Sequence, residues 1–372
     1  MPRQILITGG AGFIGSHLCD QLLGAGNRVR ILDSLSAQVH GTDGARPEYL
    51  SPDAELVHGD VRDPEVVRKA LEGVDAVYHF AAMVGVGQSM YRVNDYVSVN
   101  DLGTATLLQA LIERPVERLV VASSMSIYGE GLYRDADGRM VETAERDVDA
   151  VKRGEWELLD AQGRMLMPVP TPESKRPALA SVYALSKYVQ ERMCLMVGQA
   201  YGIGTTALRF FNAYGTRQAL SNPYTGVLAI FAARLLNGNP PMIFEDGHQR
   251  RDFVHVSDVA RACRMVLDKP EAIGRVFNVG SGQSRSVTEV AALLARSMGK
   301  NDIQPQVNSR YRVGDIRHCF ADMTLAREVL GFEAEIAIED GLAELVEWLS
   351  EQPAIDRVDA ATRELTSRGL VA

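Results

Sequence analysis

Tyr183 and Lys187 have the residue types and the spacing of a proton-transfer pair. They stand four residues apart in Tyr183-Ala-Leu-Ser-Lys187, so on a helix their side chains share one face. A phenol has an ordinary pKa of about 10 and is a poor base at neutral pH unless a nearby cation stabilises the phenolate. Lys187 supplies such a cation, and Ser124 supplies a hydroxyl that can share the substrate proton. We predict a catalytic group of Ser124, Tyr183 and Lys187; the alternative is an interface aromatic beside a solvated lysine.

A glycine pattern near the start of the chain could hold a dinucleotide. Gly9, Gly12 and Gly15 directly follow the apolar run Gln4–Thr8 and open a helical pattern. The first glycine permits a tight turn, the second a close approach of a pyrophosphate, and the third close packing of the helix on the strand. The helix N-terminus adds unpaired N–H groups and a partial positive charge. This placement favours a dinucleotide site over a plain structural turn.

Acidic residues at the ends of the next two apolar runs indicate which dinucleotide is bound. Asp33 follows the glycines by about 20 residues, where an acid accepts hydrogen bonds from the adenosine ribose. No Arg or Lys follows in Ser34-Leu35-Ser36, so nothing there favours a 2′-phosphate, and we predict NAD rather than NADP. Asp60 and Val61 are predicted to border the adenine, with a helix cap as the alternative for Asp60.

These residues require a scaffold, and the hydrophobic pattern predicts one. Short apolar runs alternate with helical patterns, which is typical of a doubly wound parallel sheet of the Rossmann type. Crossover helices would bury both faces of that sheet, which explains why its strands are continuously apolar. The predicted strands are Gln4–Thr8, Val29–Leu32, Glu55–Val57, Ala76–His79, Arg118–Ala122 and Thr205–Arg209.

The spacing of elements becomes irregular after Arg209, which predicts a second, smaller α/β domain that binds substrate. We place the NAD-binding domain at residues 1–212 and expect residues 251–280 to return to its sheet. Residues 213–250 and 281–350 then form the substrate-binding cap. The last residues, 351–372, are a polar tail whose order the sequence does not indicate.

Residues 134–177 form a polar segment inside the first domain. A near-repeat, Asp135-Ala-Asp-Gly and Asp160-Ala-Gln-Gly, predicts two small hairpins, and Pro168-Val-Pro-Thr-Pro172 predicts an extended end. The repeat can arise by chance similarity of two turns or by duplication, and the sequence favours neither explanation. We interpret the segment as an insertion over the site, without a metal because it contains neither Cys nor His.

Composition excludes several other classes of function. A net charge of -9 without a Lys/Arg cluster argues against a nucleic-acid surface. No apolar window approaches the roughly 18 residues of a membrane span, and the first residues run into a strand rather than a secretory signal, so we expect a cytoplasmic protein. The cysteines are far apart and contain no CxxC pair, so no zinc or disulfide framework is expected. They are Cys19, Cys194, Cys263 and Cys319.

Together these motifs resemble those of a known family. The chain is similar to the extended short-chain dehydrogenase/reductases of the NAD-dependent nucleotide-sugar epimerase/dehydratase family, over roughly residues 3–350. Thr216 departs from the proline that the family often has after Tyr-Gly, and we expect little effect. The matching motifs are Gly9–Gly15, Asp60–Asp63, His79–Ala82, Ser123–Gly129, Tyr183–Lys187, Arg209–Gly215, Arg251–Val256 and Arg312–Asp315.

The resemblance implies a role for each matching residue. Tyr183 would be the catalytic base, Lys187 its partner on the nicotinamide ribose, and Ser124 the catalytic hydroxyl. The implied NAD contacts are Gly9, Gly12, Phe13, Ile14, Gly15, Asp33, Asp60, Val61, Phe80, Ala81, Ala82, Asn100, Tyr183 and Lys187. The implied contacts to a nucleotide-diphosphate sugar are Ser124, Ser126, Asn212, Arg251 and Arg312. A guanidinium suits bidentate phosphate contact, with surface ion pairing as the alternative for either arginine.

The positions after Ser124 bear on the reaction. The resemblance implies that 4,6-dehydratases carry Asp-Glu where this chain has Met125 and Ser126, and that decarboxylases carry Glu at the second place. Neither Met125 nor Ser126 can serve as the acid and base of water elimination. Oxidation and re-reduction at C4 of the sugar remain, through a transient 4-keto sugar, with NAD regenerated in each cycle.

The sugar is indicated less sharply than the reaction. The segments Gly85–Met90, Ser124–Gly131 and Asn222–Gly226, with the insertion, resemble the dTDP-L-rhamnose 4-epimerase subgroup, which forms dTDP-6-deoxy-L-talose. A UDP-hexose or UDP-glucuronate 4-epimerase is the alternative, because Asn222–Gly226 is similar to those too. A 4-ketosugar reductase would need an external reductant, and a non-catalytic NAD-binding regulator would lack the Tyr/Lys pair.

The resemblance also implies an assembly. In this family the helices predicted here at 94–113 and 181–201 lie side by side and commonly form a homodimer through a four-helix bundle. Their apolar positions fit either that dimer or an intramolecular core.

Overall fold

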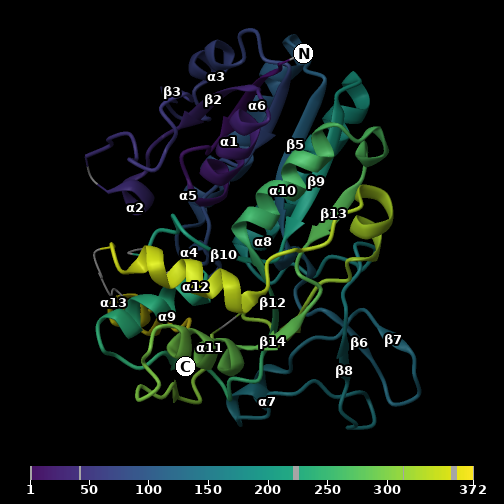
Figure 1. Ribbon diagram of the computed structural model, residues 1–372. Coiled ribbons are helices and arrows are strands. Elements are labelled where there is room, and N and C mark those ends of the chain that lie inside the picture. The colour runs from purple at the N-terminus through teal and green to yellow at the C-terminus, as the bar shows by residue number, and fades with distance from the viewer. Residues whose placement is uncertain (1, 42, 221–225, 313, 353–357, 372) are drawn as a thin grey trace.

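A parallel sheet of seven strands forms the centre of the first domain (Figure 1). In this computed structural model, residues 2–371 are described except 42, 221–225, 313 and 353–357. The strand order is β13-β9-β5-β4-β1-β2-β3, and the predicted Rossmann fold is confirmed. The strands are β1 (Gln4–Thr8), β2 (Arg28–Asp33), β3 (Glu55–His58), β4 (Ala76–His79), β5 (Arg118–Ser124), β9 (Gly204–Phe210) and β13 (Val276–Val279).

Each face of this sheet packs against its own helices because successive strand residues point to opposite sides. Ile5 and Ile7 of β1 belong to the apolar cluster under α1 and α10, whereas Leu6 belongs to the cluster under α3, α6 and α8. The continuous apolar strands therefore serve two cores. The helices are α1 (Phe13–Gly24), α3 (Pro64–Ala70), α6 (Gly103–Glu113), α8 (Val182–Tyr201) and α10 (Val256–Leu267).

The cap has its own sheet and apolar cluster below the main sheet in Figure 1. Within segment 251–280, only β13 joins the main sheet. The other strand of this segment, β12, instead pairs with β10 through residues 253–255 and with β14 and β16 through residues 250–252, while β13 takes the open side of β9. The cap elements are β10 (Asn212–Tyr214), α9 (Val227–Leu236), β12 (Arg250–His255), β14 (Ser284–Ser286), α11 (Val287–Ser297), β16 (His318–Cys319) and α12 (Ile338–Leu349).

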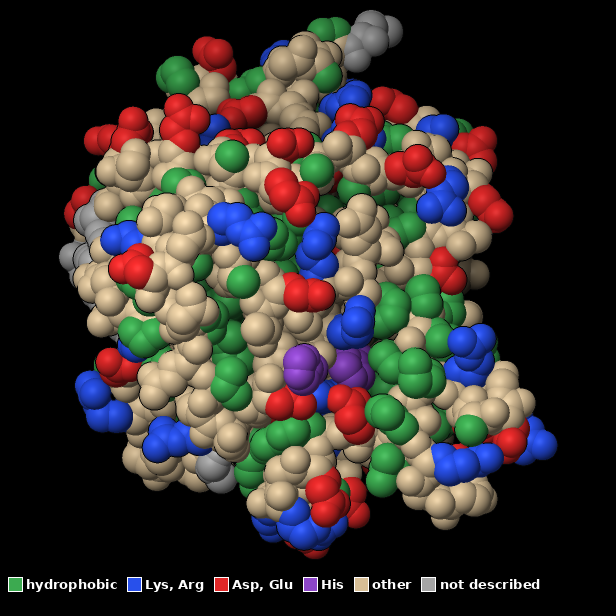
Figure 2. Space-filling model, turned by 60° about the horizontal axis from the view of Figure 1, so that its bottom comes forward, with side chains coloured by type: hydrophobic (Ala, Val, Ile, Leu, Met, Phe, Trp, Pro, Cys, Tyr) green, Lys and Arg blue, Asp and Glu red, His purple; other side chains and the backbone are tan. Residues whose placement is uncertain are grey.

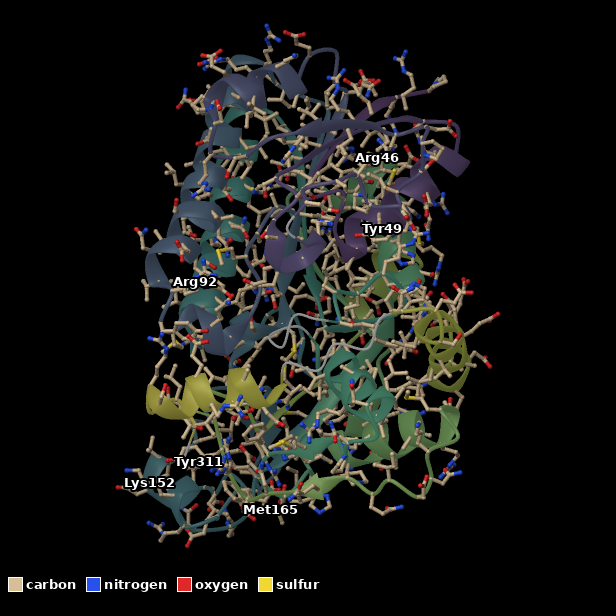
Figure 3. All side chains as sticks on the ribbon, turned by 90° about the vertical axis from the view of Figure 1, so that its left-hand side faces the viewer. Arg46, Tyr49, Arg92, Lys152, Met165 and Tyr311 are labelled. Atoms are coloured by element: carbon tan, nitrogen blue, oxygen red, sulfur yellow. The ribbon has the colours of Figure 1, made fainter. Side chains whose placement is uncertain are left out.

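The insertion folds as a small antiparallel unit with both expected hairpins. Asp135 and Asp160 each begin a turn and accept a backbone hydrogen bond four residues on, at 2.8 Å from Arg139 N and 2.9 Å from Arg164 N. Figure 3 shows Lys152 and Met165 of this segment at the far end of the molecule from Tyr49. Its elements are β6 (Leu132–Arg134), β7 (Met140–Val141), α7 (Val148–Lys152) and β8 (Met167–Val169).

The polar tail is ordered into helix α13 (Val358–Ser367), which bridges the two domains (Figure 1). Asp359 pairs with Arg234 of the cap at 2.8 Å, whereas the Arg368 guanidinium lies 4.2 Å from the ring centroid of Tyr91 in the first domain. The buried Leu365 lies against Gly87 of α4 (Val86–Ser89). Sequence pattern could not indicate this, because a short amphipathic helix gains its stability from the surface on which it packs.

The described residues contain no helix long and apolar enough to cross a membrane, and no cluster of His, Cys, Asp and Glu suited to a metal ion. The face in Figure 2 carries acidic and basic side chains next to one another rather than one basic stripe. This distribution agrees with the absence of a Lys/Arg cluster in the sequence.

Candidate active site

The glycine-rich turn between β1 and α1 has the shape that a dinucleotide requires. Gly9 has φ +69°, and a Cβ there would lie 2.8 Å from Ala81 N, so only glycine fits. A Cβ on Gly15 would lie 2.6 Å from Gly10 Cα, which explains the close helix–strand packing. Gly12 is open, with its nearest neighbour at 3.4 Å. Because the first turn of α1 has no side-chain cap and no acid, its N–H groups fit a pyrophosphate.

Asp33 lies at the end of β2, beside this turn, as predicted. Its Oδ2 accepts a hydrogen bond from Ala11 N at 3.0 Å, and its Oδ1 accepts one from Leu35 N at 2.9 Å. The carboxylate thus holds the turn to the second strand and keeps free lone pairs for hydroxyl donors. Tyr49, which sequence reasoning missed, donates its hydroxyl to Ala11 O at 2.8 Å and braces the same turn.

Asp60 is paired rather than serving as a cap. Arg62 donates to both of its carboxylate oxygens, at 2.9 and 2.6 Å, and these hydrogen bonds lower the pKa of Asp60. The cap of α3 is Asp63, which accepts hydrogen bonds from Glu65 N and Val66 N. The capping alternative for Asp60 was therefore wrong.

Asn100 lies buried in the π-helical turn η1 (Val97–Leu102) and uses its amide within the protein. Its Oδ1 accepts from Met83 N at 2.7 Å, and its Nδ2 donates to Met83 O at 3.1 Å and to Ser186 Oγ at 2.9 Å. These bonds fasten the segment that contains Phe80, Ala81 and Ala82 to α8. The side chain positions the segment that borders Gly9.

The structure brings Ser124 and Tyr183 together. Ser124 ends β5 and accepts a hydrogen bond from Ser126 Oγ at 3.0 Å. Tyr183 lies in the first turn of α8, which Ser181 caps, and its N–H donates to Ser89 Oγ at 3.0 Å. Burial raises the pKa of Tyr183, and its side-chain hydrogen bond with Ser124 opposes that increase.

Lys187 lies one turn further along α8 and is buried. Its Nζ donates to Gln190 Oε1 at 2.7 Å, and Gln190 Nε2 donates to Thr104 Oγ1 at 2.8 Å. Thr104 also hydrogen-bonds His79 at 2.8 Å. Burial lowers the pKa of Lys187 to about 8 and, with the Lys187 charge, that of His79 to about 3. A neutral polar chain therefore orients the lysine, and no sequence motif indicated Gln190 or Thr104.

The pH dependence of turnover tests the state of Lys187. Because its pKa is lowered to about 8, raising the pH through that value removes the cation that favours the phenolate of Tyr183. We expect kcat to fall on the alkaline side and the fall to move to higher pH in Lys187→Arg, whose side chain stays charged. An unchanged alkaline limb in that variant would show that another group titrates.

Two of the predicted substrate residues, Asn212 and Arg251, lie on the neighbouring strands β10 and β12 of the cap sheet. Asn212 Oδ1 is buried and has no partner among the described residues, so a ligand donor could satisfy it. Arg251 donates through Nη1 and Nη2 to the carbonyls of Arg250, Ile316 and Arg317. The Arg312 guanidinium carbon lies 4.3 Å from the ring centroid of Phe244. Residues 222–225 of the motif Asn222–Gly226 lie outside the described residues.

Comparison with known proteins supports the same interpretation. The model of the NAD dependent epimerase/dehydratase family matches residues 5–146 and 165–280. The chain belongs to this family. The interruption of the match at 147–164 lies within the insertion. As a family member the protein is an NAD-dependent enzyme of the epimerase type, so the predicted enzyme class and cofactor are confirmed.

Individual relatives match most of the chain. The dTDP-L-rhamnose 4-epimerase of Burkholderia thailandensis is 34% identical, covering 94% of this chain and 96% of the relative. The structure of UDP-glucose 4-epimerase from Thermotoga maritima, with UDP-glucose, has a TM-score of 0.76 and 30% identity, covering 94% and 99%. The Thermus thermophilus UDP-glucose 4-epimerase, with NAD, has a TM-score of 0.73 and 30% identity, covering 94% and 100%.

Proposed function

We propose that this family member is a nucleotide-sugar 4-epimerase that interconverts dTDP-L-rhamnose and dTDP-6-deoxy-L-talose. The placement of Ser124 beside the phenol of Tyr183, with Lys187 one turn away on the same helix, carries this proposal. Met125 and Ser126 follow Ser124 and offer no carboxylate for water elimination, which favours epimerisation over dehydration. The relative from Burkholderia thailandensis supports the choice of sugar.

The chain's own groups move the proton in this mechanism. Tyr183 Oη takes the proton of the C4 hydroxyl, and Ser124 Oγ, held by Ser126, keeps that oxygen in place. NAD, held by the glycine-rich turn and Asp33, would supply the hydride acceptor and donor for C4. After the sugar turns within the site, the other face of C4 would receive the hydride, and Tyr183 gives the proton back to the C4 oxygen. Lys187, oriented by Gln190, favours the phenolate before the first transfer and again after the second.

A UDP-hexose 4-epimerase is the second candidate. It is favoured by the structural match to the UDP-glucose 4-epimerase of Thermotoga maritima. Both candidates use the same Ser124, Tyr183 and Lys187 and differ in nucleotide and sugar. Substrate preference, not active-site chemistry, therefore separates them.

Incubation of the purified protein with dTDP-L-rhamnose, UDP-glucose, UDP-galactose and UDP-glucuronate tests the proposal. We expect isomerisation of dTDP-L-rhamnose in preference to the UDP-sugars, with no net NADH, and no solvent deuterium at C4 in heavy water. Net NADH consumption would indicate a reductase, and deuterium at C4 would indicate an enolising mechanism. Faster turnover of a UDP-sugar would replace the first candidate by the second.

We also propose that the protein is a homodimer through η1, α6 and α8. Large apolar side chains are exposed on these helices, including Leu102 at 55%, Leu185 at 46% and Met196 at 54%. Leu185 and Met196 are 11 residues apart on α8, which is close to three helical turns, so they lie on one face. A four-helix contact with a second copy would bury them.

Light scattering tests this assembly. We expect a dimer mass for the wild type and a monomer mass for Leu102→Glu combined with Met196→Glu, because each charge would be buried at the interface. Exposed Val307 lies on β15 (Gln306–Val307), away from these helices, and Val307→Glu serves as the control that stays dimeric. A monomeric wild type would contradict the proposal.

A further inference from the structure

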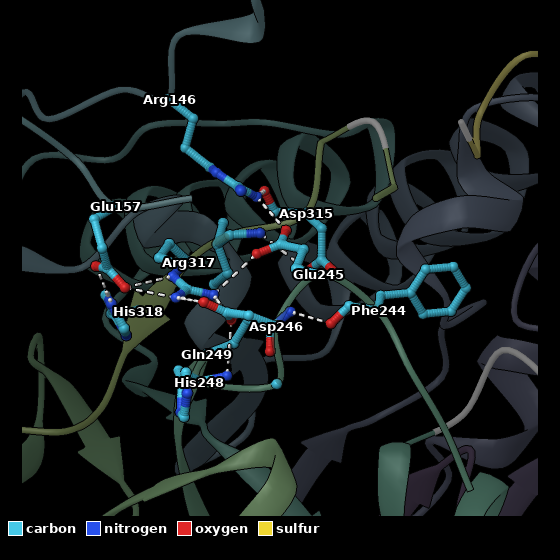
Figure 4. Close-up of polar contacts among 12 residues, drawn as sticks. Arg146, Glu157, Phe244, Glu245, Asp246, His248, Gln249, Asp315, Arg317 and His318 are labelled. Carbon is cyan, nitrogen blue, oxygen red and sulfur yellow. Dashed lines mark hydrogen bonds and ion pairs between the residues drawn. The ribbon is translucent and has the colours of Figure 1, made fainter. Parts of the chain in front are cut away.

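The insertion is joined to the cap by a buried charge cluster, shown in Figure 4. Arg317, before the short strand β16, is fully buried and donates to three carboxylates. Its Nη2 lies 2.5 Å from Glu157 of the insertion, and its Nη1 lies 2.6 Å from Asp246 and 3.1 Å from Glu245 of the cap. Ion pairs between Arg317 and these carboxylates therefore hold the insertion against the cap.

Glu245 joins this cluster to Arg146, which the insertion contributes. Glu245 is 1% exposed and has φ +58°, a backbone conformation that disfavours residues with a Cβ. Its two oxygens accept from Arg146 Nη1 at 2.6 Å and from Arg317 Nη1 at 3.1 Å. A side chain held in this way fixes the position of the Arg146 guanidinium.

Arg146 retains unused donors. Its side chain is 90% buried, yet Nε and Nη2 have no partner among the described residues. Buried cationic donors without acceptors are strongly unfavourable, so an anion fits this place. The neighbouring acids have other partners, because Glu245 also binds Arg317 and Asp315 Oδ1 accepts from Ile316 N and from Arg251.

The free donors lie beside the segment predicted to bind the substrate diphosphate. Arg146 Nη1 is 3.5 Å from Asp315 O, and Arg312 stacks on Phe244, the neighbour of Glu245. A Cβ on Gly314 would lie 2.9 Å from Ala180 O, next to the residue that caps α8. Gly314 and Asp315 thus lie between the charge cluster and the end of α8 that carries Tyr183.

We propose that Arg146 is a further substrate-binding residue, which contacts the diphosphate of the nucleotide sugar together with Arg312. The proposal rests on the proposed function. Nε and Nη2 form the edge of a guanidinium that suits bidentate contact with phosphate oxygens. Arg251, the family's diphosphate residue, has both Nη groups on backbone carbonyls and braces the segment around Ile316 instead. The insertion is then part of the substrate site.

Calorimetric binding of UDP, dTDP, uridine and thymidine to the NAD-loaded protein tests this role. We expect Arg146→Met to weaken UDP and dTDP binding by at least about tenfold, the scale of a lost charged hydrogen bond, and to leave nucleoside binding unchanged. Arg139→Met, an exposed change in the same insertion, is the matched control and should bind all four probes like the wild type. The NAD content and Tm of each variant are measured alongside.

Each outcome decides one claim. Wild-type affinity of Arg146→Met for both diphosphates, or an equal loss for nucleosides, would overturn the role of Arg146 while leaving the epimerase proposal intact. A wild type that binds no diphosphate and isomerises no sugar would overturn the proposed function itself. If Arg146→Met does not fold, Arg146→Lys replaces it, because the ammonium keeps the contact to Glu245 and loses the bidentate edge.

Discussion

Replacement of Tyr183 by phenylalanine is expected to lower kcat by about 10²–10⁴-fold while NAD remains bound, because general acid–base transfer contributes on that scale. The variant loses only the phenol oxygen, whose pKa Ser124 lowers. Its ring keeps the edge-on contact with Tyr96, at 6.4 Å between centroids, so the helix should not shift. The measurement is kcat under saturating substrate, together with the NAD content of the purified variant.

The same helix offers a matched control for this substitution. Tyr188 lies on the same α8, half-buried, and Tyr188→Phe removes a comparable hydroxyl away from Ser124. We expect near wild-type kcat for that variant. Near wild-type kcat in Tyr183→Phe would instead remove Tyr183 from the mechanism.

Replacement of Glu191, also on α8, by alanine is expected to have the second large effect, a loss of folding stability. Glu191 is 1% exposed and accepts from Arg209 Nη2 at 2.7 Å, from Arg209 Nε at 2.9 Å and from Ser123 Oγ at 2.6 Å. Glu191→Ala leaves the Arg209 cation buried without its carboxylate. We expect the free energy of unfolding to fall by about 3–5 kcal/mol, the range for breaking a buried pair from one side.

Chemical denaturation measures this change directly. Glu113→Ala, on the exposed side of α6, is the control and should change the free energy of unfolding by less than about 0.5 kcal/mol. The double variant Glu191→Leu with Arg209→Met should lose less than Glu191→Ala, because no unpaired charge stays buried. A loss below about 1 kcal/mol in Glu191→Ala would mean that Arg209 finds another acceptor.

Local sequence pattern was sufficient to predict much of the fold and the residues of the catalytic group. Apart from the edge strand β3, the strands of the main sheet are short, largely buried on both faces and marked by turns, so their apolar runs identify them in sequence. The glycines Gly9 and Gly15 were predictable because tight turns and close packing exclude a Cβ. The spacing of Tyr183 and Lys187 on one helix likewise depends only on helix geometry.

Other features depend on contacts between distant segments. The strand β12 has an apolar end that fits either sheet, and its partners β10, β14 and β16 decide which sheet it joins. The order of α13 depends on the two domain surfaces that it joins. The hydrogen bonds that Arg251 donates to backbone carbonyls could not be inferred from its motif.

By sequence alone, the chain determines its Rossmann sheet, its glycine-rich turn and the shared face of Tyr183 and Lys187, because each depends on residues close together in the chain. Tertiary structure determines how Gln190 and His79 orient the lysine, which of the two sheets each late strand joins, and where the insertion places Arg146. These are long-range contacts, and a guanidinium or amide in a sequence can pair with any complementary group that the fold brings within hydrogen-bond distance.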